Sequence, residues 1–287
     1  MLVSADGTEI YANAVGDPSK QAIVFIHGFA WSLMAFDDIF DDPQWTSQMY
    51  LVMYDVRGHG RSGKPDRDEA WESKRFAEDF DTVLEAFELK RPFVAGWSLG
   101  AAHLMDILSF HHFNYLAGII NIAGVTYLYD TFLQDLGTPL ANHLVAQVSQ
   151  SKTVEEYQQG AIDFIDACCR ALPYEVRQRC LGSIMTQPRK ALVRSVTREQ
   201  NPGVFHEVGN LPTPCLLIYG EKDEFLNERL PECYREWRNF SVEVVEGGSH
   251  VPWSKTDERA AKMFSEKMLR WMKGVMKSAI GNEASQM

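Results

Sequence analysis

The sequence lacks any long hydrophobic run, so no segment of it is expected to cross a membrane. No stretch approaches the ~18 consecutive apolar residues that span a bilayer as a helix. The first residues, MLVSADGTEIYANAVGD, also lack the basic segment and the apolar core of a secretory signal. These two absences predict a cytoplasmic protein that has no membrane partner.

Clusters of positive charge are missing as well. The 287 residues include 28 Lys and Arg against 39 Asp and Glu, which gives a formal net charge of -11. Nucleic-acid binding depends on grouped basic side chains that contact phosphates, so no nucleic-acid partner is expected. The hydrophobic content of 45% is that of an ordinary globular chain, long enough to bury a large core.

Cysteines are few and odd in number. The five lie at Cys168, Cys169, Cys180, Cys215 and Cys233, without the paired spacing of a zinc site. Such a set suits reduced thiols in a cytosol better than a disulfide framework. The sequence therefore predicts no metal site and no cofactor.

The sequence does contain a regular alternation of short apolar runs with helix-like segments. Three of the runs, AIVFI, AGIINI and CLLIY, are almost entirely apolar, as strands covered on both faces must be. The alternation predicts an α/β fold, in which a mostly parallel sheet is flanked by helices. The expected strands are Glu9–Ala14, Ala22–Ile26, Tyr50–Tyr54, Phe93–Ala95, Leu116–Ile122, Cys215–Tyr219 and Val242–Val245. The last expected helix runs from Ser254, its predicted cap, to Met276.

Between residues 126 and 200 the alternation stops and the pattern becomes helical throughout. Thr153 and Glu156 form a predicted capping box, and the helix after it carries an apolar stripe at spacings of three and four. A helical insertion of this size beside the active end of a sheet is a candidate lid. We therefore divide the chain into a core of residues 1–125 and 201–287 and an inserted helical lid of residues 126–200.

The segment GWSLG, residues 96–100, places a serine between an apolar run and a helix-like one. Glycines two positions to either side of Ser98 let the backbone turn sharply and approach its neighbours. At such a strand-to-helix corner the hydroxyl is lifted above the sheet beside a helix N-terminus, as a nucleophile requires. A serine that only caps the following helix is the plainer alternative.

A serine nucleophile needs a base, and the base needs an acid that fixes its tautomer. His250 follows the SVEVV run and the EGGS turn, so it is expected at the carboxyl end of a strand, where α/β sheets bind ligands. Asp223 follows the CLLIY run and is expected at the same edge of the sheet. We predict His250 as the base and Asp223 as the acid, with Asp130 as the alternative acid.

Acyl transfer also needs donors for the oxyanion that develops on the attacked carbonyl. The predicted donors are the backbone N–H of Leu99, which follows the serine, and that of Phe29, in the loop after AIVFI. Aromatic side chains on loops beside these positions predict an apolar substrate-binding pocket. They are Trp31, Trp97, Tyr127, Phe225 and Trp253.

Five motifs in this order resemble the α/β-hydrolase superfamily over nearly the whole chain. They are His27-Gly28-Phe29, the YDVRGHGRSGKP segment, GWSLG, the GEKD that ends at Asp223 and the GGSH that ends at His250. The resemblance implies an eight-stranded, mostly parallel sheet with a lid inserted after the sixth strand. Within the superfamily the chain is most similar to small esterases and cofactor-free haloperoxidases. Epoxide hydrolases and haloalkane dehalogenases are disfavoured, because they place Asp where this chain has Ser98.

The leading hypothesis is a serine hydrolase that cleaves a small hydrophobic carboxylic ester through an acyl-enzyme. Lactonase, thioesterase, amidase and carbon–carbon bond hydrolase activities require the same triad and stay open. A slow-turnover small-molecule receptor of the same fold, and an acyltransferase whose lid excludes water, are the remaining alternatives. The one partner expected is a small-molecule substrate.

Overall fold

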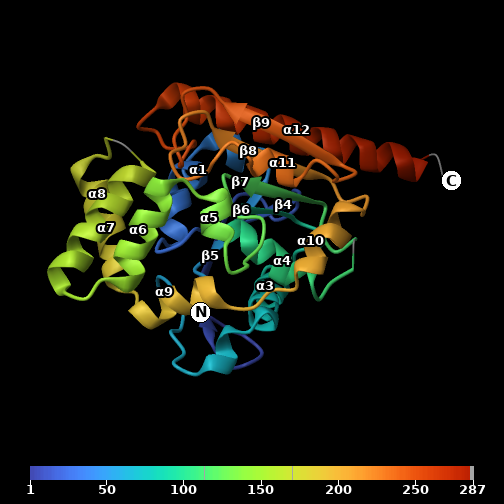
Figure 1. Ribbon diagram of the computed structural model, residues 1–287. Coiled ribbons are helices and arrows are strands. Elements are labelled where there is room, and N and C mark those ends of the chain that lie inside the picture. Colours follow the sequence, from blue (N-terminus) through green and yellow to red (C-terminus); the bar gives the residue numbers. More distant parts are fainter. Residues whose placement is uncertain (113, 170, 285–287) are drawn as a thin grey trace.

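A computed structural model describes residues 1–112, 114–169 and 171–284 and has an α/β architecture (Figure 1). Over the described residues the main sheet has seven strands in the order β3-β5-β4-β6-β7-β8-β9. β3 pairs antiparallel with β5, and the other neighbours pair parallel, which confirms the predicted fold class. The strands are β3 (Ala12–Val15), β4 (Ala22–Ile26), β5 (Tyr50–Tyr54), β6 (Phe93–Trp97), β7 (Gly118–Ile122), β8 (Cys215–Gly220) and β9 (Phe240–Val245).

The prediction of eight strands was wrong. The residues before Ala12 form β1 (Leu2–Val3) and β2 (Glu9–Ile10), which pair with each other in a separate two-stranded sheet. Gly7, at a φ of 84°, closes the turn between them, so the chain joins the main sheet only at β3. For the same reason the helical segment follows β7, the fifth strand of the main sheet along the chain, rather than a sixth strand.

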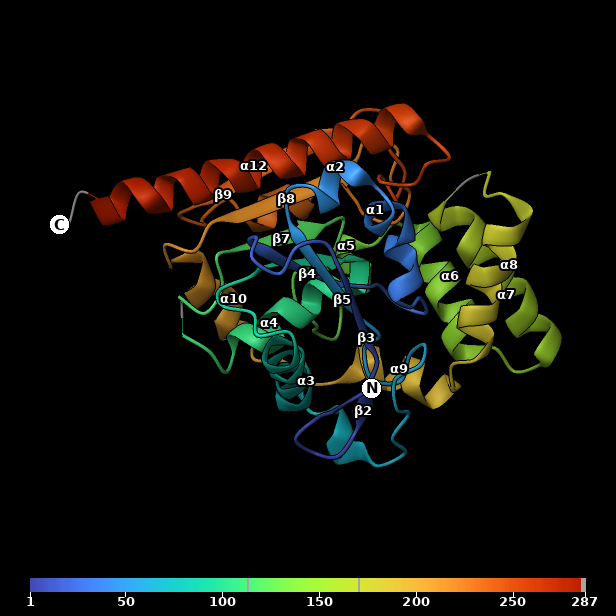
Figure 2. The same ribbon diagram turned by 180° about the vertical axis from the view of Figure 1, so that it is seen from behind.

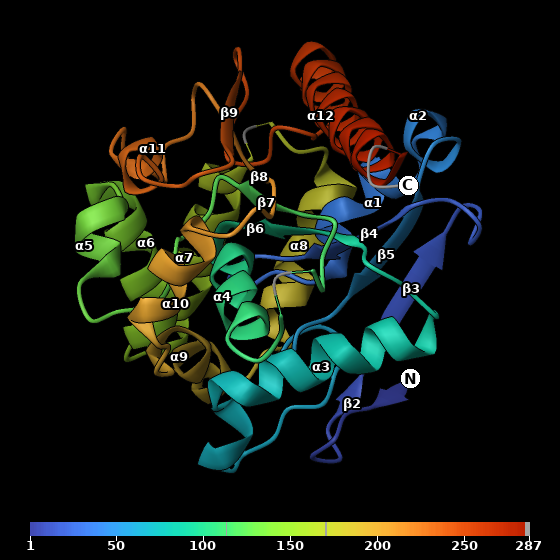
Figure 3. The ribbon, with the colours of Figure 1, turned by 90° about the vertical axis from the view of Figure 1, so that its right-hand side faces the viewer.

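Helices cover both faces of the main sheet (Figure 3). Side chains of successive strand residues point to opposite faces, so Phe25 packs on Trp45 while its neighbour Val24 joins the cluster around Phe76. One face carries α1 (Asp37–Phe40), α2 (Pro43–Thr46) and α12 (Glu258–Ala284), and the other carries α3 (Ser73–Ala86), α4 (Ala102–Leu108) and α10 (Pro202–Gly209).

The residues between β7 and β8 form helices that stand beside the sheet, with α6, α7 and α8 grouped at one side (Figures 1 and 2). The predicted capping box is present, since Thr153 Oγ1 accepts a hydrogen bond from the Glu156 N–H at 3.1 Å and the Glu156 carboxylate accepts one from the Thr153 N–H. The helices before α10 are α5 (Phe132–Leu136), α6 (Pro139–Gln150), α7 (Val154–Cys168), α8 (Tyr174–Met185) and α9 (Arg189–Thr197).

The last helix begins later than the sequence predicts. Ser254 was expected to cap it, but the N–H of Ser254 bonds to Val251 in a turn, and the Asp257 carboxylate accepts from the Ala260 N–H at 3.0 Å. Asp257 therefore caps α12. Within the described part of the chain, no helix combines the length and the apolar character needed to cross a bilayer. The short elements are η1 (Leu33–Phe36), η2 (Asp68–Trp71), η3 (Ser98–Ala101) and α11 (Leu230–Cys233).

Candidate active site

Ser98 stands at the corner between β6 and the consecutive helices η3 and α4. Its φ of 54° lies in the left-handed region, which costs a residue other than glycine roughly 1–3 kcal/mol. A Cβ on Gly96 would collide with the Gly100 carbonyl, and one on Gly100 with the Ile26 carbonyl, so these positions accept only glycine. The fold therefore holds Ser98 in a strained conformation at the carboxyl end of β6.

The structure brings the three side chains of the predicted triad together. His250 Nε2 lies 3.0 Å from Ser98 Oγ, and His250 Nδ1 lies 2.8 Å from Asp223 Oδ2. Asp223 follows β8 and His250 follows its parallel neighbour β9, so both loops meet Ser98 at one edge of the sheet. The His250 and Asp223 side chains are only 2% and 4% exposed, so these hydrogen bonds lie in a medium of low dielectric constant.

Neighbouring groups hold the Asp223 and His250 side chains in place. Asp223 Oδ1 accepts a hydrogen bond from the Phe225 N–H at 2.8 Å, which leaves Oδ2 for the imidazole. The Phe225 ring stacks on the His250 ring with centroids 4.4 Å apart. On the backbone side, the indole N–H of Trp97 donates to the His250 carbonyl at 2.8 Å. The imidazole is therefore restrained through both its ring and its main chain.

The loop after β4 lies directly against Ser98. A Cβ on Gly28 would come within 2.9 Å of Ser98 Cβ, so glycine at this position lets the Phe29 backbone approach the serine. The Leu99 N–H belongs to the first turn of η3, where a helix offers no acceptor. No group among the described residues accepts a backbone hydrogen bond from the Phe29 N–H. Both residues border the space in front of Ser98, where the predicted oxyanion would form.

A small cavity, called here the inner cavity, lies beside Ser98 and His250. Its volume is about 50 Å³, which is room for a few water-sized groups at about 10–15 Å³ each. Most of its wall could not be predicted from the sequence, because helical periodicity shows which face of a helix is apolar but not whether that face meets a helix or a cavity. The missed residues are Val125, Phe132, Leu133, Leu136, Ala141, Val145, Phe164, Val196 and Leu226.

Of the five aromatic residues predicted to line the pocket, Phe225 lines the inner cavity and the other four do not. Trp97 and Trp253 are 0% and 2% exposed and pack on each other in the core, with ring centroids 5.3 Å apart. Trp31 packs on Trp97 and borders a different cavity, while Tyr127 packs against α10. Loop position places the backbone near the site, but the direction of each side chain is set by its packing partners.

Three other histidines are buried among the loops and helices of the sheet region. Burial lowers the pKa of His27 and of His59 to about 3, and burial together with the Arg198 charge lowers the pKa of His103 to about 4. Neutral His27 accepts a hydrogen bond from the Val56 N–H at 3.0 Å, which ties the loop beside Ser98 to the strand edge. These histidines stay uncharged over the physiological pH range.

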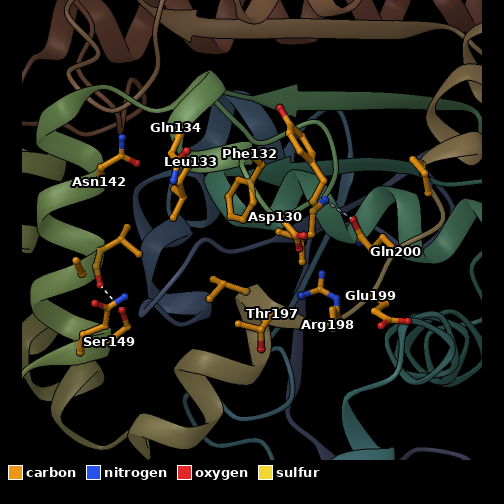
Figure 4. Close-up of a pocket in the computed structure, with 17 residues that line it drawn as sticks. Asp130, Phe132, Leu133, Gln134, Asn142, Ser149, Thr197, Arg198, Glu199 and Gln200 are labelled. Atoms are coloured by element: carbon orange, nitrogen blue, oxygen red, sulfur yellow. Dashed lines mark hydrogen bonds between the residues drawn. The ribbon is translucent and has the colours of Figure 1, made fainter.

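A wider cleft, called here the outer cleft, opens next to the inner cavity (Figure 4). Its volume is about 810 Å³, and α5, α6, the end of α9 and residues 198–202 bound it. Exposed Asp130, the alternative acid, lies here and not beside His250. Four apolar residues line both spaces and separate them, and we call them the gate: Phe132, Leu133, Val145 and Val196.

Comparison with known sequences defines the class of this fold and site. The family model described as the alpha/beta hydrolase family matches residues 23–262, so the chain belongs to the alpha/beta hydrolase family. Among curated relatives, the "Probable oxidoreductase EphD" of Mycobacterium tuberculosis is 36% identical over 84 residues. Those residues are 29% of this chain and 14% of the relative, so the chain matches only a small part of that protein's length.

Solved structures resemble the chain over nearly its whole length. The esterase RhEst1 from a Rhodococcus species superposes with a TM-score of 0.83 at 20% identity, over 96% of this chain and 98% of its own. A bromoperoxidase from Bacillus anthracis superposes with a TM-score of 0.74 at 20% identity, over 95% of this chain and 99% of its own. These likenesses agree with the resemblance drawn from the sequence motifs and establish the fold.

Proposed function

We propose that the chain is a serine hydrolase that cleaves a small, hydrophobic carboxylic ester. The observation that carries the proposal is the hydrogen-bonded series from Asp223 through His250 to Ser98, at 2.8 and 3.0 Å. A serine hydroxyl is a weak nucleophile at neutral pH, and a buried imidazole that accepts its proton activates it. The apolar lining of the inner cavity and the esterases among the structural neighbours support the ester class.

In the proposed first half-reaction, Ser98 Oγ attacks the carbonyl carbon of the ester and its proton passes to His250 Nε2. The carbonyl oxygen becomes an oxyanion that accepts hydrogen bonds from the N–H groups of Phe29 and Leu99. The tetrahedral intermediate then expels the alkoxide, which takes the proton from His250 and leaves as the alcohol. Asp223 stays ionised and holds the imidazole in the required tautomer.

In the second half-reaction, water attacks the acyl group on Ser98. His250 accepts a proton from the water, and the oxyanion forms again at the N–H groups of Phe29 and Leu99. When the carbon–oxygen bond to the serine breaks, His250 returns the proton to Ser98 Oγ. The carboxylic acid leaves, and the free enzyme is restored.

We also propose that residues 126–200 act as a lid over a core of residues 1–125 and 201–287. Helices α5, α6, α7 and α9 supply seven of the fifteen residues that line the inner cavity and leave it with about 50 Å³. A substrate larger than a few atoms needs these helices to shift before it reaches Ser98.

We place the protein in the cytosol. Cys168, Cys180 and Cys215 are buried in the fold as thiols and are not joined in disulfides. A reducing compartment keeps thiols in this state, whereas an oxidising one favours disulfides.

A fluorophosphonate probe tests the nucleophile, because it reacts with an activated serine. Peptide mapping should find the label on Ser98 in the parent and none in Ser98→Ala. Ser109→Ala is the matched control, since Ser109 follows α4 and its hydroxyl donates to the Met105 carbonyl away from the triad. A label on another residue, or undiminished labelling of Ser98→Ala, would contradict the assignment.

A substrate panel tests the reaction class. We expect rapid release of nitrophenol from short-chain nitrophenyl esters, lost in Ser98→Ala and kept in Ser109→Ala. Lactones, thioesters and diketone substrates, tested under the same conditions, should give a lower kcat/KM than the esters. A higher value for one of those classes would replace the ester assignment while keeping the triad.

A further inference from the structure

We infer that the outer cleft is the entrance for substrate and binds the alcohol part of the ester, a part larger and more polar than the acyl group. The inference rests on the proposed ester hydrolysis at Ser98, and it limits the small, hydrophobic character of the substrate to the acyl group. The inner cavity holds about 50 Å³ and the outer cleft about 810 Å³. Because the inner cavity has room for only a few water-sized groups, a short acyl group fits there and the remainder of the ester lies outside the gate.

The gate connects these two spaces directly. Phe132 and Leu133 come from α5, Val145 from α6 and Val196 from α9, and each of the four lines both the inner cavity and the outer cleft. A third cavity of about 200 Å³, bordered by Trp31 and the start of α8, shares no lining residue with the inner cavity over the described ranges. The route from solvent to Ser98 therefore runs past the gate.

The order of the chemical steps indicates which part of the ester lies in the inner cavity and which lies in the outer cleft. The acyl group stays bound to Ser98 after the first half-reaction, while the alcohol must leave before water attacks. The alcohol therefore needs an open path to solvent when the acyl group still occupies the inner cavity. The outer cleft supplies that path.

The charged side chains that the outer cleft exposes are carboxylates (Figure 4). The side-chain oxygen of Asn142 is buried and has no hydrogen-bond partner among the described residues. Asp130 and Glu199 are exposed carboxylates in the same cleft, whereas the Arg198 guanidinium is buried and paired with Asp106 at 2.7 Å. This arrangement favours an alcohol part that donates hydrogen bonds or carries positive charge, and disfavours one with a carboxylate.

Acetate esters with different alcohol parts test the inference in the full-length protein. We expect the kcat/KM for choline acetate and for glycerol monoacetate to exceed that for acetylglycolate at least tenfold. Val196→Phe, which narrows the gate, should lower kcat/KM at least tenfold for the two favoured esters and less than threefold for methyl acetate. Val176→Phe makes the same change in the wall of the third cavity and should leave all values within twofold of the parent.

Two results would overturn the inference while leaving the proposed function intact. One is an unchanged kcat/KM for the large esters in Val196→Phe, and the other is a preference for acetylglycolate, each with Ser98 still labelled by the fluorophosphonate. Loss of labelling in the parent protein would instead remove the proposed function. If circular dichroism shows that Val196→Phe does not fold, Val145→Leu tests the same gate with a smaller increase in side-chain volume.

Discussion

The loops at the strand ends and the helical segment between β7 and β8 contribute differently to the candidate site. Ser98, Asp223 and His250 all lie in loops that follow parallel strands, and hydrogen bonds of 2.8 to 3.0 Å connect them. Helices α5, α6, α7 and α9 instead contribute apolar side chains that enclose the inner cavity. The strand-end loops therefore supply the hydrogen-bonded side chains and part of the cavity wall, while the helical segment supplies only apolar wall.

The helix next to Ser98 is also more deeply buried than the helices of the segment between β7 and β8. All seven residues of α4, the helix that continues from the Ser98 corner, are buried. Only Ala141, Leu144 and Val148 are buried among the twelve residues of α6, which lines the inner cavity. A helix with few buried contacts opens at a lower free-energy cost than one surrounded by the core. The comparison suggests that the triad is held rigidly while the helices around it can adjust.

The largest expected effect is the loss of turnover when Asp223, in the loop after β8, is replaced. Asp223→Asn should lower kcat by about 10⁴-fold, because the amide favours the wrong imidazole tautomer. The melting temperature should change by only a few degrees, since the side chain keeps its shape. Steady-state kinetics on a nitrophenyl ester measures the loss.

Glu221→Gln is the matched control for this prediction. Glu221 lies in the same turn, is exposed and accepts a hydrogen bond from the Gly247 N–H at 2.9 Å. Its kcat should stay within threefold of the parent. If Asp223→Asn also stayed within threefold, the acid would have to be another residue.

Acid should destabilise the sheet region through its buried histidines. The pKa values of His27, His59 and His103 are lowered to about 3, 3 and 4 in the fold, while an unfolded histidine titrates near 6.5. Below pH 6.5 the unfolded chain binds protons that the folded chain does not, so stability is highest above that pH and is lost as the pH falls. The slope for each histidine approaches roughly 1.4 kcal/mol per pH unit well below pH 6.5, so each should cost about 2 kcal/mol between pH 7 and 5, as measured by urea unfolding.

His59→Asn separates the loss of stability caused by buried histidines from that caused by other groups that titrate at low pH. Asn retains a donor for the Arg57 carbonyl, which the His59 ring contacts through Nδ1 at 3.1 Å. The slope of unfolding free energy against pH should fall by about one third, because two of the three buried histidines remain. An unchanged slope would show that His59 does not contribute.

A smaller effect is expected at Trp97, which joins the Ser98 corner to the His250 loop. Trp97→Phe keeps an aromatic ring but leaves the buried His250 carbonyl without its donor, at a cost of about 1–3 kcal/mol in stability. We expect kcat to fall about tenfold with KM within twofold, because the imidazole loses its backbone restraint.

Trp45→Phe is the control for a purely structural loss. Trp45 is also fully buried, and its indole N–H donates to Ser265 Oγ at 2.9 Å, away from the triad. It should lose similar stability in urea unfolding while kcat stays within twofold of the parent. Equal kcat values for the two variants would exclude a positioning role for Trp97.

The smallest effect is expected in the helical segment. Thr153→Ala removes the capping box of α7 and should lower the free energy of unfolding by about 1 kcal/mol, or the melting temperature by about 2–4 °C. Glu156→Gln keeps a side chain that completes the box and should lose less than half as much. Scanning calorimetry checks both values, and a larger loss for Glu156→Gln would contradict the capping account.

Local patterns allowed much of the sheet to be predicted. β4 and β5 begin and end where the apolar runs predict, because an uninterrupted apolar run bounded by polar residues has few other conformations that bury it. The capping box was also predicted, since its two hydrogen bonds involve residues three apart. The start of α12 was not, because Ser254 and Asp257 are both good caps and the Ser254 turn selects the second.

By itself the sequence determined the α/β class, the position of the helical segment and the order of Ser98, Asp223 and His250 along the chain. Those features depend on periodicity and on residues close in sequence. Only the tertiary structure decided the number of strands in the main sheet, the burial of Trp97 and Trp253, and the gate between the two cavities. Each of these depends on which distant segment a side chain or strand meets, and that choice is made by the packing of the whole fold.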